Sequence, residues 1–266
     1  MQDRRGLTLV EVLVTAAVTA VLLALSIPML KSGRDSGRAV VCISNLKQIS
    51  LITELYAQDH GSFPQGFCRL STYTKSAPAG GFAGNQLYDL PGWWWFDFLG
   101  IEDRSSGGVL WCPSRRPMNS PLGEDILWCN YGINYSIAKW ASETASGEFL
   151  GRPLSKGQIR RPSEMLVYSD SGYGLISWKA AAGMEHPFDN NPMRDDSFYL
   201  PGLTVNHARP IHPQQQADAL AGRHRGGTVS VAYADGQVAS RKAERFWVRA
   251  DEKGVLFPLY FWTAGR

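Results

Sequence analysis

An apolar segment of membrane length near the start of the chain limits how the rest can fold. From Leu7 to Leu30 the sequence reads LTLVEVLVTAAVTAVLLALSIPML, and Glu11 is its only strongly polar residue. At about 1.5 Å per residue, a helix of this segment is roughly 36 Å long, which exceeds a hydrocarbon core of about 30 Å. The segment therefore predicts a membrane-spanning helix, and the remaining chain must fold outside the bilayer.

The charges on either side of this segment predict its orientation. Arg4 and Arg5 precede it, and basic residues favour the cytoplasmic side of a membrane. Lys31, Arg34 and Arg38 follow it and weaken the bias. We expect the short leader to stay in the cytoplasm and the bulk of the chain to be exported.

A cleaved secretory signal is the main alternative for the segment. The apolar run is longer than a typical signal core, no A-x-A site closes it, and Glu11 would only weaken insertion. A carboxylate costs up to about 2.5–3.5 kcal/mol at the centre of a membrane and less near an interface.

If the chain were cut between Gly6 and Leu7, the new amino group of a neighbouring copy could pair with Glu11 and set the register of adjacent helices.

The stretch RRGLTLVE resembles the prepilin peptidase site of type IV pilins and type II secretion pseudopilins. That site has a glycine, a hydrophobic first mature residue and a glutamate as the fifth, here Gly6, Leu7 and Glu11. The resemblance implies cleavage after Gly6 and N-methylation of Leu7 by prepilin peptidase, although Leu7 departs from the commoner phenylalanine. Pro28 falls where many pilins place a proline that kinks the helix.

The residues after the apolar segment predict that the helix continues. An apolar stripe with spacings of three and four describes one face of an amphipathic helix, and this face needs a covering surface. The stripe consists of Cys42, Leu46, Ile49, Ile52 or Thr53, and Tyr56. Gly61 is a natural C-cap, and Pro64 blocks continuation of the helix.

Several downstream phrases resemble a subgroup of pilin-like proteins with a terminal H-x9-D-G element, abundant in planctomycete and verrucomicrobial bacteria. The phrases are VCISNLKQISLITELYAQDHGSFP, GWWWFDFLG, VLWCPS, RRPSEMLVYSDSG and RHRGGTVSVAYADGQV. The resemblance implies a Trp-containing helix, a strand end at the Cys-Pro pair, a turn followed by a strand, and a last hairpin. Residues 69–87 and 179–219 have no counterpart in it.

The last phrase also predicts a β-hairpin from its own pattern. Apolar residues alternate with small or polar ones from Thr228 to Tyr233, and Asp235-Gly236 supplies a tight two-residue turn. Ten residues separate His224 from Asp235 instead of nine, which allows a bulge or a shifted register. We interpret the two side chains as a polar clasp that closes the hairpin and its entry loop, because no other His or Cys stands at ligand spacing beside them.

The four cysteines indicate disulfides, because an exported domain folds in an oxidising compartment. Cys42, Cys68, Cys112 and Cys129 allow three pairings, and the spacing does not choose among them. Cys112 and Cys129 flank a Pro-rich loop and make an easy local pair. The resemblance, in contrast, has Cys42 and Cys112 at recurrent positions and implies a bridge between helix and sheet. No C-x2-C pair exists, so a zinc site is not expected.

Two further segments have competing interpretations. The run Trp93-Trp94-Trp95-Phe96 is either an aromatic platform for sugars or a partner, or part of the core. Consecutive helical residues point in different directions, so we expect at least two of the rings in the core.

The second segment is FDNNPMRDDSFY, which contains Asp189, Asp195 and Asp196. An oxygen-rich loop of this kind suits calcium, and it loosely resembles calcium-binding major pseudopilins. We favour a solvated loop with no metal or cofactor.

Other classes of function find little support in the sequence. The net charge is only +3 and the basic residues are scattered, so no nucleic-acid partner is expected. The sequence contains no G-x-S-x-G, no H-E-x-x-H and no Gly-rich phosphate loop after a strand. We therefore expect no enzymatic activity.

These observations predict an α+β pilin-like protein, with a long N-terminal helix packed on an antiparallel sheet. Its segments are a leader (1–6), a transmembrane helix half (7–30), an exported helix half (31–61) and a globular head with a C-terminal hairpin (62–266). We expect a filament subunit of a type IV pilus or a type II secretion pseudopilus, first held in the inner membrane with its head in the periplasm. Its expected partners are prepilin peptidase, other subunits and an inner-membrane assembly platform. The alternatives are a membrane-anchored exported adhesin or carbohydrate-binding module, and an exported enzyme held at the membrane.

Overall fold

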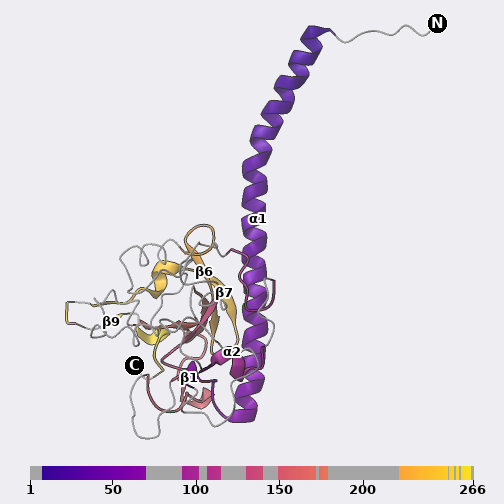
Figure 1. The fold of residues 1–266 in the computed structure, drawn as a ribbon. Coiled ribbons are helices and arrows are strands. Elements are labelled where there is room, and N and C mark those ends of the chain that lie inside the picture. Colours follow the sequence, from indigo (N-terminus) through magenta and orange to yellow (C-terminus); the bar gives the residue numbers. More distant parts are fainter. Residues whose placement is uncertain are drawn as a thin grey trace. The chain divides into compact units, whose positions relative to one another are not determined.

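The computed structural model describes residues 8–69, 92–101, 107–114, 130–139, 149–171, 174–178, 222–250, 252–254, 256–257 and 259–264, which are coloured in Figure 1. The chain divides into two units, Met1–Gly37 and Arg38–Arg266. In chain order the elements are α1 (Leu9–His60), β1 (Phe67–Arg69), β2 (Gly92–Trp94), α2 (Trp95–Phe98), β3 (Tyr131–Asn134), η3 (Lys156–Gln158), β4 (Leu166–Asp170), β5 (Leu175–Ile176), β6 (Thr228–Tyr233), β7 (Val238–Lys242), η5 (Ala243–Phe246), β8 (Arg249–Ala250), β9 (Leu256–Phe257) and η6 (Leu259–Phe261).

The described part of the first unit is the start of α1. The helix begins directly after Thr8 and runs through Pro28 without a break in its assignment. Its apolar side chains are exposed, as at Leu13, Leu22 and Leu25, and none of its most apolar stretch is buried by the protein. By length and composition α1 can cross a membrane.

The second unit is built around a five-stranded sheet with the strand order β5-β3-β4-β6-β7. Its pairs are antiparallel, as predicted, except that β3 and β5 run parallel through Ile133↔Leu175 and Asn134↔Ile176. The centre of the sheet is buried on both faces, since every residue of β3 and β4 is buried. The fold is therefore of the α+β, pilin-like class, with a mixed sheet.

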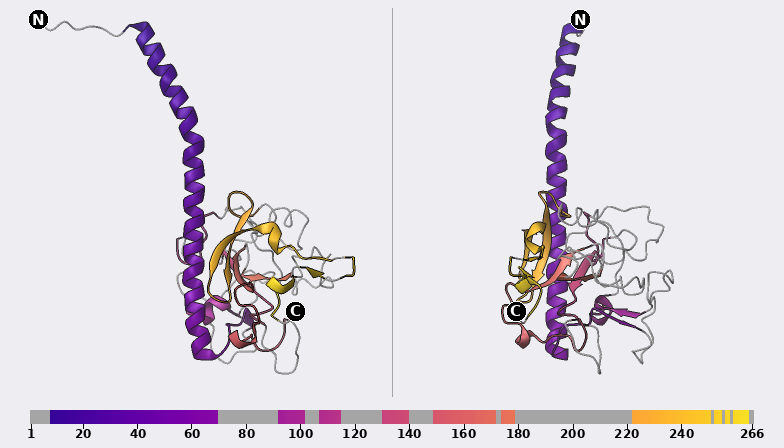
Figure 2. Two further views of the ribbon diagram at one scale, coloured as in Figure 1. Left: turned by 180° about the vertical axis from the view of Figure 1, so that it is seen from behind. Right: turned by 90° about the vertical axis from the view of Figure 1, so that its left-hand side faces the viewer.

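Residues 38–60 of α1 pack on this sheet, as the amphipathic stripe predicts. The buried positions are Cys42, Asn45, Leu46, Ile49, Ser50, Thr53 and Ala57. The hydroxyls of Thr53 and Tyr168 on β4 lie 2.8 Å apart, and Lys47 Nζ donates to the carbonyl of Gly236 at 2.8 Å. Figures 1 and 2 show β6 and β7 beside this part of the helix. The sheet is thus the surface that covers the stripe.

The C-terminal end of α1 lies where the sequence predicts it. Gly61 has a φ of +73° and donates its N–H to the carbonyl of Ala57 at 3.0 Å. A glycine adopts this left-handed conformation without the steric penalty of a Cβ, and so it caps the helix. The predicted C-cap is confirmed.

Aromatic rings fill the core between the sheet and its connections, as predicted. Trp94, Trp95 and Phe96 are buried, whereas Trp93 is half-buried. The indole N–H of Trp95 donates to the carbonyl of Gly174 at 2.8 Å, so its polar atom is satisfied in the core. The local structure differs from the implied helix, because β2 takes the first two tryptophans and α2 begins only at Trp95.

Two further details differ from the sequence interpretation. The residues from Gly107 to Ser114 contain no strand, so the strand end implied at Cys112-Pro113 is wrong. The β6–β7 turn has three residues instead of two, because Tyr233 N–H donates to Gln237 O while Gly236 N–H donates to Tyr233 O. With Gly236 at φ +81°, this is a type I turn followed by a glycine bulge.

Candidate functional sites

The first candidate site is the start of α1, where Thr8 and Glu11 form a capping box. The N–H and the hydroxyl of Thr8 each donate to Glu11 Oε2 at 2.8 Å, and Glu11 N–H donates to Thr8 Oγ1 at 3.3 Å. Such a pair satisfies backbone donors that have no partner within the helix. Sequence reasoning missed this role for Glu11, although the T-x-x-E spacing carries the signal.

The other hydroxyl groups of the apolar stretch are satisfied within the helix. Thr15 donates to the carbonyl of Glu11 at 2.9 Å, Thr19 to that of Thr15 at 2.8 Å, and Ser26 to that of Leu22 at 2.7 Å. Hydroxyls bonded to their own helix carry no unmet donor into hydrocarbon. Glu11 is then the one charged side chain that the stretch from Leu9 to Leu30 would place in a membrane.

Several predicted site residues lie outside the described part of the chain. They are Gly6, Leu7, Cys129, Asp189, Asp195 and Asp196. Cys68 is placed by its backbone on β1. The cleavage site, the calcium loop and the pairings of Cys68 and Cys129 stay predictions.

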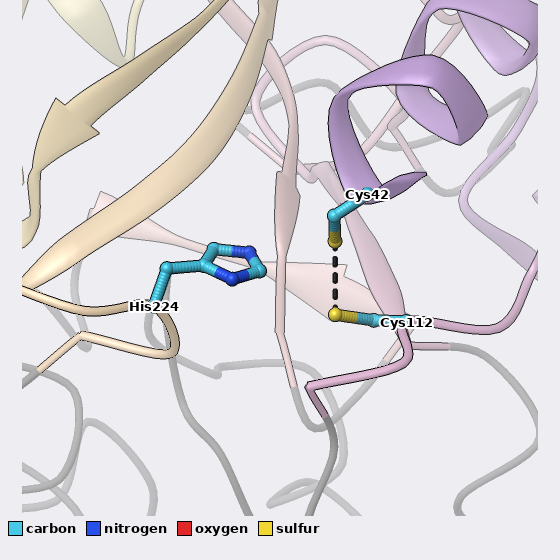
Figure 3. A group of neighbouring side chains, drawn as sticks. All are labelled: Cys42, Cys112 and His224. Atoms are coloured by element: carbon cyan, nitrogen blue, oxygen red, sulfur yellow. Dashed lines mark hydrogen bonds between the residues drawn. The ribbon is translucent and has the colours of Figure 1, made fainter. Parts of the chain in front are cut away.

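The second candidate site is a buried cluster of Cys42, Cys112 and His224 in the second unit. Cys42 comes from α1, Cys112 from the loop after Trp111, and His224 from the segment that leads into β6. The two Sγ atoms are 2.9 Å apart and both residues are free cysteines. Each residue offers one ligand-type atom, and these atoms lie within 4.8 Å of one another. Figure 3 shows the His224 ring turned toward the two sulfurs.

Neighbouring side chains hold this cluster in place. Asp170, at the end of β4, has Oδ2 at 2.8 Å from Nε2 of His224, and the same oxygen accepts the backbone N–H of Ser230 at 2.9 Å. The hydroxyl of Tyr131 lies 3.2 Å from Cys42 Sγ. Arg223 donates through Nη1 to the carbonyl of Asn130 at 2.7 Å. These contacts fix the orientation of the histidine ring and place the Tyr131 hydroxyl against the Cys42 sulfur.

The surroundings of Cys42 and Cys112 shift the pKa values of their thiols in opposite directions. Burial alone would raise the pKa of Cys112, but contacts with Cys42 and His224 and the charge of Arg223 outweigh it and lower the pKa to about 5. Burial, the contact with Cys112 and the charges of Cys112 and Asp170 instead raise the pKa of Cys42 well above its usual value. The cluster therefore favours a thiolate at Cys112 and a thiol at Cys42.

The basic residues of the cluster, His224 and Arg223, favour their charged forms. Burial would lower the pKa of His224, yet Asp170 and Cys112 beside the ring raise it to about 9. Burial also opposes the charge on Arg223, but the negative Cys112 and Asp170 raise its pKa. Burial and the two cysteines raise the pKa of Tyr131, which stays a neutral hydroxyl.

The predicted clasp between His224 and Asp235 is wrong in its partner. The His224 side chain contacts Asp170, and Asp235 accepts the N–H of Gln237 at 2.9 Å through Oδ1. The backbone of His224 does close the entry loop, because it bridges to Thr228. Sequence reasoning missed Asp170 and Arg223, and the three ligand-type residues are too far apart along the chain for a spacing motif to reveal them.

Comparison with known proteins identifies the N-terminal segment. Residues 1–27 match the model of the prokaryotic N-terminal methylation motif. The match takes in Gly6, Leu7 and Glu11, and it supports processing of a pilin-type chain by prepilin peptidase. No curated protein and no solved structure matches the chain. The N-terminus therefore carries the prepilin-type motif. The function of the head has to be argued from its structure.

Proposed function

We propose that this protein is a subunit of a filament of the type IV pilus or type II secretion pseudopilus kind. It is cut after Gly6, methylated on Leu7 and held in the inner membrane by the first part of α1 until it assembles. The match of residues 1–27 to the prepilin-type motif is the observation that carries this proposal. The exported part is then an α+β head that supplies contacts to other subunits or to a cargo.

The geometry of the helix start supports an assembly role. A carboxylate can accept about four hydrogen bonds, and both bonds from Thr8 end on one oxygen of Glu11. The capping box therefore leaves Glu11 able to accept the Leu7 amine of a neighbouring subunit. Pairing between subunits would offset the cost of carrying a carboxylate into the membrane.

The different burial of the two parts of α1 also supports this function. The side chains before Gly37 are largely exposed, whereas residues 38–60 bury one face against the head. An exposed apolar stretch of this length is stable in lipid or against the same stretch of other copies. A chain with a membrane helix that continues into its head suits transfer from the bilayer into a helical bundle.

The experiment that tests assembly is fractionation of the full chain in cells with a working filament system. We expect the cut protein in sheared surface or periplasmic filaments, and we expect the uncut protein to stay in the membrane when prepilin peptidase is inactive. Strains lacking either the pilus platform or the type II secretion platform identify which filament takes it up. Retention in the membrane with all of these systems active would contradict the proposal and favour an anchored adhesin.

A further inference from the structure

The cluster of Cys42, Cys112 and His224 is a ligand set that the filament role does not use. All three side chains are buried, the two cysteines completely, so the cluster is not an incidental surface arrangement. Two sulfurs and an imidazole are the side-chain atoms that zinc and related transition metals prefer. The three atoms already converge within 4.8 Å, from three separate elements of the second unit.

The distance between the sulfurs fits two outcomes equally well. Two thiolates at about 2.3 Å from one tetrahedral zinc lie roughly 3.8 Å apart, so the present 2.9 Å would have to open by about 0.9 Å. A disulfide at about 2.05 Å would require the sulfurs to approach by a similar amount. The surroundings of the sulfurs therefore decide between the two.

Those surroundings favour a metal. A disulfide carries no charge and gives the His224 ring no role, whereas the ring faces the sulfurs and is held by the Asp170 carboxylate. A histidine whose second nitrogen meets a carboxylate is the usual outer-shell arrangement of a zinc ligand. The Tyr131 hydroxyl beside Cys42 and the Arg223 guanidinium beside Cys112 suit metal-bound thiolates, which are strong acceptors.

The charges of such a site also balance. When zinc binds, the thiol of Cys42 and the ring of His224 each release a proton to solvent. Zinc with two thiolates and a neutral imidazole carries no net charge, and the remaining Arg223 and Asp170 neutralise each other in the buried cluster. The cluster can thus hold a divalent ion without a buried net charge.

We propose that Cys42, Cys112 and His224 bind one zinc ion, with Asp170 as the residue that positions the histidine ring. Zinc would tie α1 to the loop at Cys112 and to the segment leading into β6. The fourth position of the tetrahedron is left to water. The site belongs to the head and is independent of cleavage and filament assembly.

The test is metal analysis of the full chain, purified in detergent with a chelator-free buffer. We expect one zinc per chain, in the cut and the uncut protein alike. Replacement of zinc by Co²⁺ should give a thiolate-to-cobalt charge-transfer band, which needs no variant and so does not depend on a variant's folding. A disulfide between Cys42 and Cys112 in the isolated protein, or the absence of this band, would overturn the proposal.

Variants locate the site. Cys42→Ser, Cys112→Ser and His224→Gln should each lose the stoichiometric zinc, and Asp170→Asn should keep the cobalt band while zinc affinity falls by about 10–100-fold. His60→Gln is the matched control, because His60 is exposed at the end of α1. Zinc retained in all three ligand variants, or lost equally in the control, would assign the metal elsewhere and overturn the proposal.

Discussion

At the scale of single residues, Glu11 has one bonding partner in its own chain and an expected second partner in a neighbouring subunit. Within one chain it closes the capping box with Thr8, and between chains it is expected to accept the amine of a processed Leu7. The two roles depend on different properties of the side chain. Capping needs only a hydrogen-bond acceptor, and glutamine serves as well as glutamate at this position of a capping box. The pairing between subunits needs the charge.

The variant Glu11→Gln separates these roles. We expect it to be inserted and cut normally, while its share in the filament fraction falls at least tenfold, equivalent to about 1.4 kcal/mol of lost pairing. The measurement is the ratio of cut protein in sheared filaments to cut protein in membranes. Thr8→Val is the control, because it removes the hydroxyl that bonds Glu11, costs about 1 kcal/mol of helix capping, and leaves both the charge of Glu11 and the backbone N–H of residue 8. Normal incorporation of Glu11→Gln would show that the charge has no part in assembly.

Gly222 places the segment that carries Arg223 and His224. Its φ is +71°, and a Cβ there would come within 2.5 Å of the carbonyl carbon of Gly227. Gly226 has a similar φ of +77°, but a Cβ there would meet nothing within 4 Å. The two glycines thus share the backbone strain and differ in the steric contact.

Gly222→Ala should therefore be clearly more destabilising than Gly226→Ala. Both lose about 1–2 kcal/mol to the left-handed conformation. Gly222→Ala loses a further 1–3 kcal/mol, roughly, to the backbone clash. Denaturant unfolding followed by tryptophan fluorescence measures the difference. Equal losses in the two variants would mean that the backbone around Gly222 relaxes freely and does not set the position of His224.

At the scale of elements, residues 38–60 of α1 combine two unlike faces. Leu46 is completely buried against the sheet, whereas Leu51 is 61% exposed on the same helix. Both are leucines within a few turns of each other, so their helix propensities cancel in a comparison. The difference between them isolates what the packing of the helix on the sheet contributes.

Leu46→Ala should cost about 2–5 kcal/mol of unfolding free energy, because it leaves a cavity between helix and sheet. Leu51→Ala should change the unfolding free energy by no more than about 0.5 kcal/mol. The same unfolding assay of the full chain in detergent measures both. A small loss for Leu46→Ala would mean that α1 is not part of the cooperative core of the head.

At the scale of the whole molecule, local sequence patterns predicted the helix and strand segments. Contacts between residues far apart in the chain could not be predicted from such patterns. The apolar run, the stripe after Cys42 and the cap at Gly61 are local signals, and the structure follows them. The alternation from Thr228 to Tyr233 predicted the strand with one apolar face, yet all but its first residue is buried, so both faces of β6 are covered. The pattern did not predict that β6 pairs with β4 as well as with β7. Pairing order of this kind depends on segments far apart in the chain.

The two candidate sites differ in the same way, because one is a local motif and the other is formed by residues far apart in the chain. Gly6, Leu7 and Glu11 stand within a few residues of each other, so their spacing could be recognised directly. Cys42 and Cys112 could be named as residues of interest, but their approach to His224 and Asp170 exists only after the sheet has formed. Asp170 carries no local signal, since an aspartate at the end of a strand is common at turns.

The central claim is that this chain enters the pilin pathway through its N-terminus. The most direct test is intact-mass and N-terminal analysis of the membrane protein, made with and without an active prepilin peptidase. We predict a chain that begins at Leu7, heavier by one methyl group, only when the peptidase is active. A chain that still begins at Met1 with the active peptidase, or one cut between Ser26 and Ser36, would contradict the account and make α1 a plain anchor or a cleaved signal.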